Sequence, residues 1–419
     1  MADVAQTLAA LDSKFTNPSF QPGFINSLNS RNEFYKLINK KRAKFPAGEG
    51  HNITTLTDDL VSFAPAGNAA GLFPDASRLE FARYVILSRN LHLKAQIDGI
   101  VLDRATGTLN SAGDIFKQTS LAFSRVAQKQ LQRALFADGS GKLGVVTAYA
   151  GGTPSITLAA TGDKTKLVRY IKKGMNLAVY DNSNDTYRGK AKVTAINRST
   201  NVVTLDGTIA ATDADDYVTL ASSAAAGTLD LDVWGLNYHV DDTTPATYQG
   251  ITRSSIEVSQ AKVFSNSGTN RALSKDLMHQ AYMWPTIATD ALDSDPYRYI
   301  MDSSTLYEFN KLFMGQTQFR PKEENLGGFS MTPSWMKPII QDSDCPYHTI
   351  FYVNPSDFTV YYYRDWEFVK NGSSLLWFNT GASASDTYYM YMIARLNMAC
   401  TKPRAQVKIE DITATPIAA

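Results

Sequence analysis

Residues 111–137, SAGDIFKQTSLAFSRVAQKQLQRALFA, are followed by DGSG at 138–141, and together they predict one long helix that stops at glycines. Ser111 is a suitable N-cap with Asp114 three residues on, a variant of the capping box. After Gly113, neither proline nor glycine interrupts the run. Spacings of mostly three and four residues predict one apolar stripe, formed by Ile115, Ala122, Phe123, Val126, Leu131, Ala134 and Leu135.

A helix of this length would be about 40 Å long, because each residue adds about 1.5 Å. That length exceeds the width of a small compact domain. The subunit is therefore expected to be elongated, and elongated subunits usually belong to assemblies.

The composition is that of a folded protein of two or three domains, with 44% hydrophobic and 19% charged residues among 419. The formal net charge is +1, which argues against a dedicated nucleic-acid binder and leaves only local contacts with nucleic acid. The first ten residues lack the features of a signal peptide, so we expect a cytosolic origin. No apolar run is long enough for a membrane helix, and no membrane partner is expected.

The N-terminal region has short helical patterns, the last at residues 31–44, with apolar Phe34, Leu37 and Ile38. This last pattern holds the densest basic cluster of the chain: Lys36, Lys40, Lys41, Arg42 and Lys44. A solvated helix face is the plainer interpretation, and a surface that faces phosphates is the alternative.

Strand patterns follow at residues 79–87 and 91–101, after the small-residue segment 64–71. We interpret residues 53–109 as a projecting hairpin, since Gly, Pro and small residues break the segment. Long hairpins are marginally stable alone, so this arm must lie against something else.

A compact all-β pattern occupies residues 166–222, with turn residues between short strands. It predicts a small barrel inserted in the main fold, because five strands follow at short intervals. The flanks at 147–162 and 221–227 are rich in small residues, as linkers are. The predicted strands are 167–171, 175–180, 191–196, 202–205 and 217–220.

The last third predicts helices at 270–291 and 303–314 and strands within 347–363 and 388–412. Helices and strands thus follow one another without a regular repeat. This indicates the α+β class.

Two short motifs suggest ligand sites and fail on their details. Gly139-Ser140-Gly141-Lys142 lacks the earlier glycine and the following Ser or Thr of a phosphate loop, and it follows a helix instead of a strand. Residues 181–185 resemble the start of a calcium loop, but Thr186 stands where glycine is needed and Lys192 where the closing glutamate belongs. A hairpin turn explains the second motif better.

Catalytic chemistry has no sequence signature here. The five histidines form no HExxH or paired spacing, and no G-x-S-x-G elbow occurs. Cys345 and Cys400 are expected to be buried, inert thiols. We therefore predict no enzyme, no catalytic, cofactor-binding or metal-ligating residue, and no cofactor, although carboxylates from distant positions could still form a glycosidase pair.

In its order of elements the chain resembles the major capsid proteins of tailed bacteriophages, which share the Hong Kong 97 fold. The resemblance covers residues 52–412 and rests on three segments together: the long helix with its DGSG end, YQGITRS at 248–254, and PIIQD at 338–342 leading into YHTIFYVN at 347–354.

The resemblance implies an α+β capsid fold with a long spine helix, an extended N-terminal arm and a projecting loop, to which this chain adds a small inserted β-barrel-like domain. The implied divisions are an N-terminal arm, an extended loop with peripheral-domain strands, a spine helix with the peripheral domain, the β insertion, and an axial domain that returns to the peripheral domain. Their bounds are 1–52, 53–110, 111–165, 166–222 and 223–419.

The function that the resemblance implies is self-assembly of hexamers and pentamers into an icosahedral shell around double-stranded DNA. Portal, scaffolding and decoration proteins are further implied partners. The implied location is the virion, assembled in the host bacterial cytoplasm. An encapsulin-like cellular compartment is the alternative within the same fold, and a carbohydrate-binding or hydrolytic protein is the alternative of another class.

A shell protein needs large interfaces, and the extended segments of this chain cannot cover their own apolar side chains. We expect neighbouring subunits to cover them and the basic cluster at residues 36–44 to face DNA. The expected inter-subunit contacts are Phe15, Phe20 and Phe24 in the arm and Phe63, Leu72 and Phe73 in the loop.

Overall fold

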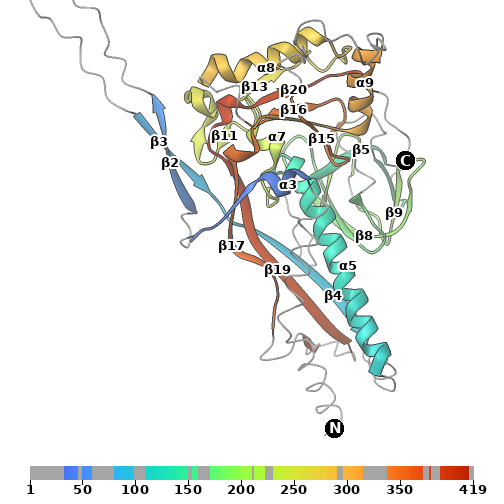
Figure 1. Cartoon of the computed structure of the whole chain (residues 1–419). Coiled ribbons are helices and arrows are strands. Elements are labelled where there is room, and N and C mark those ends of the chain that lie inside the picture. Colours follow the sequence, from blue (N-terminus) through green and yellow to red (C-terminus); the bar gives the residue numbers. More distant parts are fainter. Residues whose placement is uncertain are drawn as a thin grey trace, which may run out of the picture.

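The computed structural model describes residues 33–45, 50–58, 80–98, 109–149, 153–158, 170–209, 212–221, 230–289, 296–314, 337–370, 377–378 and 387–414. Figure 1 shows a sheet of long strands beside a long helix, a barrel to one side, and a second sheet with two helices above. A two-stranded ribbon extends on the side away from the barrel. Helices and sheets are mixed, which confirms the α+β class.

The long helix α5 (Leu109–Phe136) has 28 residues and ends as expected before the DGSG turn. Its buried positions Phe123, Ala127 and Leu131 are four residues apart, so they lie on one face of the helix. Ala122, expected on this face, is exposed, and Ala127 is buried instead. The side chain of Ile115 lies outside the described residues.

Close packing fixes the end of α5. Gly139 has φ +86, and a Cβ there would lie 2.5 Å from Cδ1 of Trp234. A Cβ on Gly235 would lie 2.3 Å from the carbonyl oxygen of Ala134. Only glycine fits at positions 139 and 235, and the end of α5 packs closely against residues 234–235.

The lower sheet has the order β1-β17-β19-β18, and β4 pairs with β19. Alternate residues of β19, including Met390 and Leu396, are buried in the same core as Phe123 and Leu131 of α5. The short helix α3 (Glu33–Leu37) adds Phe34 to this core. The strands are β1 (Asn39–Arg42), β17 (Phe358–Phe368), β18 (Trp377–Phe378), β19 (Thr387–Cys400) and β4 (Arg89–Asp98).

The expected helix at residues 31–44 is wrong beyond residue 37. Residues 39–42 form strand β1, which pairs in parallel with β17. Phe34, Tyr35 and Ile38 are buried where the chain changes from helix to strand. Lys and Arg favour a helix over a strand, so the pairing with β17 overrides the local preference of this stretch.

The expected hairpin of residues 79–87 and 91–101 is also wrong in its pairing. Strand β3 (Glu80–Ile86) pairs with β2 (His51–Asp58), and these two strands form the ribbon. Strand β4 instead pairs with β19 through ten residues. Its Leu91, Leu93 and Ala95 pack against the core under α5, which explains why β4 is part of the sheet and not of the projecting arm.

The closed barrel has the strand order β10-β5-β6-β9-β8-β7. It begins before residue 166, because residues 142–158, which were assigned to the peripheral domain and interpreted as a linker from 147, supply two strands with buried Val146, Ile156 and Leu158. Residues 170–171 are not a strand, although the sequence predicted one at 167–171. The strands are β5 (Lys142–Tyr149), β6 (Ser155–Leu158), β7 (Asn176–Tyr180), β8 (Tyr187–Asn197), β9 (Val202–Leu205) and β10 (Tyr217–Leu220).

The upper sheet has the order β13-β20-β16-β14-β15, and helices α8 (Lys275–Thr289) and α9 (Ser303–Met314) lie beside it (Figure 1). Both helices were expected, and α8 begins five residues later than predicted. Asp302 caps α9 by accepting from the backbone N–H of Ser304 at 3.0 Å. The strands are β13 (Lys262–Phe264), β20 (Val407–Ile409), β16 (Ile350–Val353), β14 (Arg298–Met301) and β15 (Ile339–Gln341).

Short elements connect the two sheets. They are α7 (Leu236–His239), β11 (Thr247–Tyr248), β12 (Ile251–Thr252) and the 3-10 turns η1 (Arg253–Ser255), η2 (Glu257–Ser259), η3 (Pro355–Asp357) and η4 (Pro403–Ala405).

Candidate functional site

The ribbon β2–β3 is held at its base by the β11–β12 hairpin, which belongs to the YQGITRS segment. Gln249 and Gly250 form the turn with φ values of 48 and 86. The carbonyl oxygen of Gln249 accepts from the backbone N–H of Val85 at 2.7 Å. A Cβ on Gly250 would lie 3.3 Å from Cβ of Val85. This turn therefore fixes the position from which the ribbon extends.

A buried arginine lies directly behind this turn. Arg253 is 0% exposed, and its Nη2 donates to the carbonyl oxygen of Tyr238 at 2.5 Å. Its Nη1 donates to the carbonyl oxygen of Asp241, and its guanidinium lies 4.4 Å from the ring centroid of Tyr248. Carbonyl groups and an aromatic face thus take the place of water around this charge.

His239 adjoins the same cluster. Its Nδ1 lies 2.9 Å from the hydroxyl of Tyr248, and its ring is fully buried. Burial, reinforced by the positive charge of Arg253, lowers the pKa of His239 to about 3. The imidazole is therefore neutral at physiological pH, and it serves packing and hydrogen bonding instead of acid–base chemistry.

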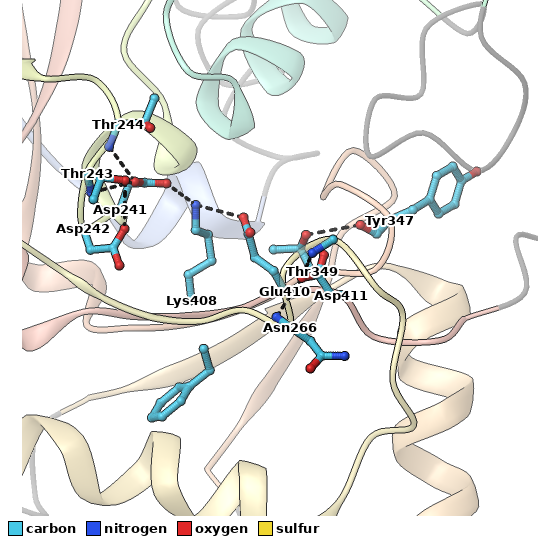
Figure 2. Close-up of polar contacts among 12 residues, drawn as sticks. Asp241, Asp242, Thr243, Thr244, Asn266, Tyr347, Thr349, Lys408, Glu410 and Asp411 are labelled. Carbon is cyan, nitrogen blue, oxygen red and sulfur yellow. Dashed lines mark hydrogen bonds and ion pairs between the residues drawn. The ribbon is translucent and has the colours of Figure 1, made fainter.

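A second charged cluster joins the upper sheet to the chain after α7 (Figure 2). Nζ of Lys408 on β20 lies 2.5 Å from Oδ2 of Asp241 and 3.0 Å from Oε1 of Glu410. Oδ1 of Asp241 accepts from the backbone N–H groups of Thr243 at 3.1 Å and Thr244 at 2.8 Å. The Lys408 side chain is 3% exposed, so solvent screens these pairs little.

Asp241 is the centre of this cluster. Burial acts to raise its pKa, but the charge and hydrogen bond of Lys408 and the two backbone donors outweigh burial, so the pKa of Asp241 is lowered. Its carbonyl oxygen also accepts from Arg253 and from the backbone N–H of Ala261. One residue thereby connects the ribbon base, the upper sheet and the segment between them.

A cavity of about 420 Å³ lies where this cluster meets the barrel and the end of α5. Several of its charged side chains form ion pairs: Lys408 with Asp241 and Glu410, and Arg133 with Asp232 at 2.5 Å. Paired charges of this kind hold structural units together.

The structure brings the five predicted basic residues to one edge of the lower sheet. Lys36 is in α3, Lys40, Lys41 and Arg42 form most of β1, and Lys44 follows; all five are exposed. Among the described strands β1 pairs only with β17, and all four of its residues are exposed. Exposed lysines on an open edge also discourage unwanted strand pairing.

The six predicted contact residues, Phe15, Phe20, Phe24, Phe63, Leu72 and Phe73, lie outside the described residues. The ribbon nevertheless presents an apolar pair that the sequence analysis missed. Leu56 and Phe81 are cross-strand partners, 38% and 62% exposed. The strand alternation of the ribbon contained this signal, but its register was needed to place the two side chains together.

The sequence analysis also missed Arg253 and Lys408. Arg253 lies in the quoted segment 248–254, and Lys408 interrupts an apolar strand, so both positions carried a weak signal. Burial of a charge depends on carbonyls and carboxylates that are distant in sequence, and no local pattern reveals those.

The two rejected motifs are turns in the structure. Asp138 accepts from the backbone N–H of Ser140 at 3.0 Å, which closes the turn after α5. Asp181 accepts in the same way from Ser183 at 2.8 Å, between β7 and β8. Within the described residues, no group of three or more His, Cys, Asp or Glu is placed to hold a metal ion.

Two other predictions concern thiols and membranes. Cys345 and Cys400 are buried and unpaired with each other, and burial raises the pKa of Cys400 well above its usual value. In the part of the chain that the structure describes, no helix is long and apolar enough to span a bilayer.

Comparisons with known proteins give a likeness in structure alone. No model of a protein family matches the chain, and no curated protein matches it. The capsid of the native GTA particle aligns with 91% of this chain and 90% of its own at 9% identity and a TM-score of 0.46. Gordonia phage Cozz aligns with 91% of this chain and 86% of its own at 10% identity and a TM-score of 0.42.

We infer the fold from the match with the cyanophage A-1(L) capsid. It aligns with 90% of this chain and 91% of its own, at 11% identity and a TM-score of 0.52. Coverage of both chains means that the likeness concerns the whole architecture. The resemblance stated from the sequence is confirmed at this level: the chain has the fold of the cyanophage A-1(L) capsid.

Proposed function

We propose that this chain is the major capsid protein of a tailed bacteriophage and assembles into an icosahedral shell around a double-stranded DNA genome. The observation that carries the proposal is the fold likeness to the cyanophage A-1(L) capsid along nine-tenths of both chains. On this proposal the role is structural and not enzymatic. The product is the virion, assembled in the cytoplasm of the host bacterium.

The exposed ribbon supports an assembly in which neighbouring subunits bury each other's apolar surface. Leu56 and Phe81 are exposed, so no described residue of the same subunit buries them. A groove of about 470 Å³ lies between α5, β4 and the barrel, lined in part by Leu93, Val126 and Leu231. We place the ribbon of one subunit against this groove of its neighbour, with α5 as the rigid rod beneath it.

The magnitude of this contact favours a many-membered assembly. Full burial of one Phe or Leu side chain contributes about 1.5–3 kcal/mol. One ribbon therefore binds weakly, but a subunit held by several neighbours gains from multivalency. A closed shell can then be stable although each pairwise contact is weak.

The domain roles follow from the same proposal. On this proposal residues 1–52 are the arm, 53–110 the extended loop and peripheral-domain strands, 111–165 the spine helix and peripheral domain except for the barrel strands within it, and 223–419 the axial domain with its return to the peripheral domain. The barrel is the insertion, extended from the predicted 166–222 to include strands β5 and β6. Hexamers and pentamers of the chain itself would surround the axial domains.

The basic edge is proposed to face the packaged DNA. Its five cations, at residues 36–44, are exposed and close together, while the whole chain is nearly neutral. Such a local patch can neutralise phosphates without holding the genome too strongly for release. Portal, scaffolding and decoration proteins complete the proposed set of partners.

Two other functions remain as outcomes of a test. An encapsulin-like compartment would package a cargo enzyme instead of a genome. A carbohydrate-binding or hydrolytic protein, with its site on the barrel, would be a monomer or small oligomer. Light scattering separates the last class from both shells, and the packaged content separates the two shells.

The proposal is tested by deleting most of strand β2 together with the segment that follows it. Deletion of residues 54–78 should leave soluble subunits that form no shells in electron micrographs, while the intact chain forms them under the same conditions. Circular dichroism of the deleted subunit checks that the rest remains folded. Normal shells from a folded deletion variant would refute the role of the ribbon.

A further inference from the structure

The ribbon is a lever that magnifies small changes at its base. Strand β2 pairs with β3 from His51 and Ile86 at the base to Leu56 and Phe81, the apolar pair, five residues further along. Those five residues span about 16 Å at about 3.3 Å each. A tilt of about 10° at the base therefore moves the apolar pair by about 3 Å, which is most of the about 4 Å between packed apolar side chains. The direction of the ribbon must be fixed closely if a neighbour is to receive it.

The turn at Gln249 fixes that direction through three contacts. Its carbonyl oxygen accepts from the backbone N–H of Val85 in β3 at 2.7 Å. Its own backbone N–H donates to the hydroxyl oxygen of Tyr238 in α7 at 2.9 Å. The ring of the preceding residue, Tyr248, packs edge to face with that of Tyr84 in β3, with centroids 5.7 Å apart. The direction of β3 therefore depends on where Tyr238 and Tyr248 lie.

Arg253 holds both tyrosines in place. Its Nη2 donates to the carbonyl oxygen of Tyr238 at 2.5 Å, and its guanidinium lies 4.4 Å from the ring centroid of Tyr248. Its Nη1 donates to the carbonyl oxygen of Asp241. A guanidinium is planar and its donors point in fixed directions, so it sets the angles between these groups as well as the distances. The side chain is completely buried, so water does not compete for these contacts.

The same arginine is linked to the upper sheet. The carboxylate of Asp241 pairs with Lys408 of β20 (Figure 2), and its carbonyl oxygen also accepts from the backbone N–H of Ala261, next to β13. The carbonyl oxygen of Arg253 accepts from Nε2 of Gln260 at 3.1 Å, and Gln260 likewise precedes β13. A continuous series of contacts therefore joins the upper sheet to the base of the ribbon.

We propose that Arg253 is a positioning residue for assembly: it fixes the angle between the ribbon and the upper sheet, and this angle sets the curvature of the shell. This role rests on the shell function proposed above and adds a determinant of shell geometry to it. Neighbouring copies would meet through the ribbon, so one ribbon angle in every copy gives one rotation between neighbours. A repeated contact closes only when its rotation permits, and a changed rotation gives open or irregular assemblies.

A purely structural arginine predicts a different outcome. Its loss would lower the fraction of folded subunit and therefore the yield of particles, but the particles that form would have the wild-type diameter. A positioning arginine predicts a changed diameter or a loss of closure even when the concentration of folded subunit is matched. The diameter and closure of the particles therefore separate the two roles.

Arg253→Lys is the first test, because it keeps the positive charge but loses the planar fork that reaches two carbonyl groups. Circular dichroism gives the fraction of folded subunit, and variant and wild type are then assembled at equal concentrations of folded subunit. Electron micrographs should show a shifted or broader distribution of diameters, with open or irregular particles. Closed particles with the wild-type distribution of diameters would overturn the proposal.

Arg271→Lys is the matched control. Nη2 of Arg271 also donates to a carbonyl oxygen, that of Phe264 in β13 at 2.8 Å, but this contact belongs to the upper sheet and not to the base of the ribbon. The variant should lower the yield at most and leave the diameter unchanged. A change of diameter equal to that of Arg253→Lys would overturn the proposal, because the effect would then not be specific to the ribbon base.

Tyr238→Phe is the second test, and it applies even if Arg253→Lys does not fold. It removes the hydroxyl that accepts from Gln249, while the ring can stay stacked on Trp234, with centroids 4.6 Å apart. The link from Arg253 to the turn is then weakened without any change of buried charge. Diameters should shift or broaden as in Arg253→Lys, to a smaller extent, and wild-type diameters would overturn the proposal.

The two proposals fail in distinguishable ways. If the intact chain forms no particles, the shell function fails. If the intact chain forms particles and the variants at positions 253 and 238 both form closed shells of wild-type diameter, only the role of Arg253 fails.

Discussion

Replacing Asp241 by Asn tests whether the charged cluster joins the upper sheet to the rest of the subunit. The change preserves the shape of the side chain and removes the negative charge that lies 2.5 Å from Nζ of Lys408. Lys408 then stays buried with Glu410 at 3.0 Å as its remaining carboxylate. The upper sheet should consequently detach more easily from the segment after α7.

The expected cost follows from burial. Breaking a fully buried ion pair costs about 3–5 kcal/mol. Glu410 remains in place here, and Asp241 is 16% exposed, so we expect about 2–3 kcal/mol. In native-state hydrogen exchange of unassembled subunits, the amides of β20 should exchange about 30- to 150-fold faster.

Two further variants isolate the cause. Asp242→Asn removes the same charge at the neighbouring exposed position and should change stability by less than about 0.5 kcal/mol. Asp241→Asn/Lys408→Met removes both members of the pair and should recover part of the loss, because the buried lysine that lost one of its two carboxylates is gone, although Glu410 then loses its contact with Lys408. Unchanged exchange of β20 in Asp241→Asn would refute the role of this pair.

Three other predictions concern the ribbon, the buried histidine and the basic edge. Phe81→Ser should change the free energy of subunit unfolding by less than about 0.5 kcal/mol, because the side chain is 62% exposed. It should nevertheless reduce the yield of particles measured by sedimentation. An equal yield would contradict the ribbon contact. The pKa of His239 is lowered to about 3 in the folded chain, so below about pH 6.5 the imidazole gains a proton more easily in the unfolded chain. The free energy of unfolding should therefore decrease as the pH falls below about 6.5, by about 2 kcal/mol at pH 5. In denaturant unfolding, His239→Gln should lose less unfolding free energy between pH 7 and pH 5 than the unchanged chain does. Identical pH profiles of the two proteins would contradict this assignment. Lys40→Gln/Lys41→Gln/Arg42→Gln should lower genome retention in full particles while empty shells still form, and an unchanged yield of full particles would exclude the DNA-facing role.

Local sequence pattern was sufficient for the elements whose stability is local. The 3.6-residue periodicity predicted α5, and the helix predicted at residues 303–314 has the bounds of α9. The turn residues between residues 175 and 220 likewise separated the strands of the barrel. Each of these signals lies within the element that it predicts.

Pairing partners could not be predicted in the same way. The sequence predicted strands at 79–87 and 91–101, but only distant β2 and β19 determine that the two strands diverge. Residues 147–162 were interpreted as a linker because of their small residues, although Ile156 and Leu158 alternate inward and complete the barrel. Arg253 and Lys408 are buried because carbonyls and carboxylates from other segments surround them, which no local window contains.

We propose that the exposed ribbon of this chain is covered by further copies of the chain. Negative-stain electron microscopy of the purified full chain is the decisive test. Closed, uniform shells far larger than one subunit are expected. A monodisperse monomer or small oligomer at every protein concentration would contradict it.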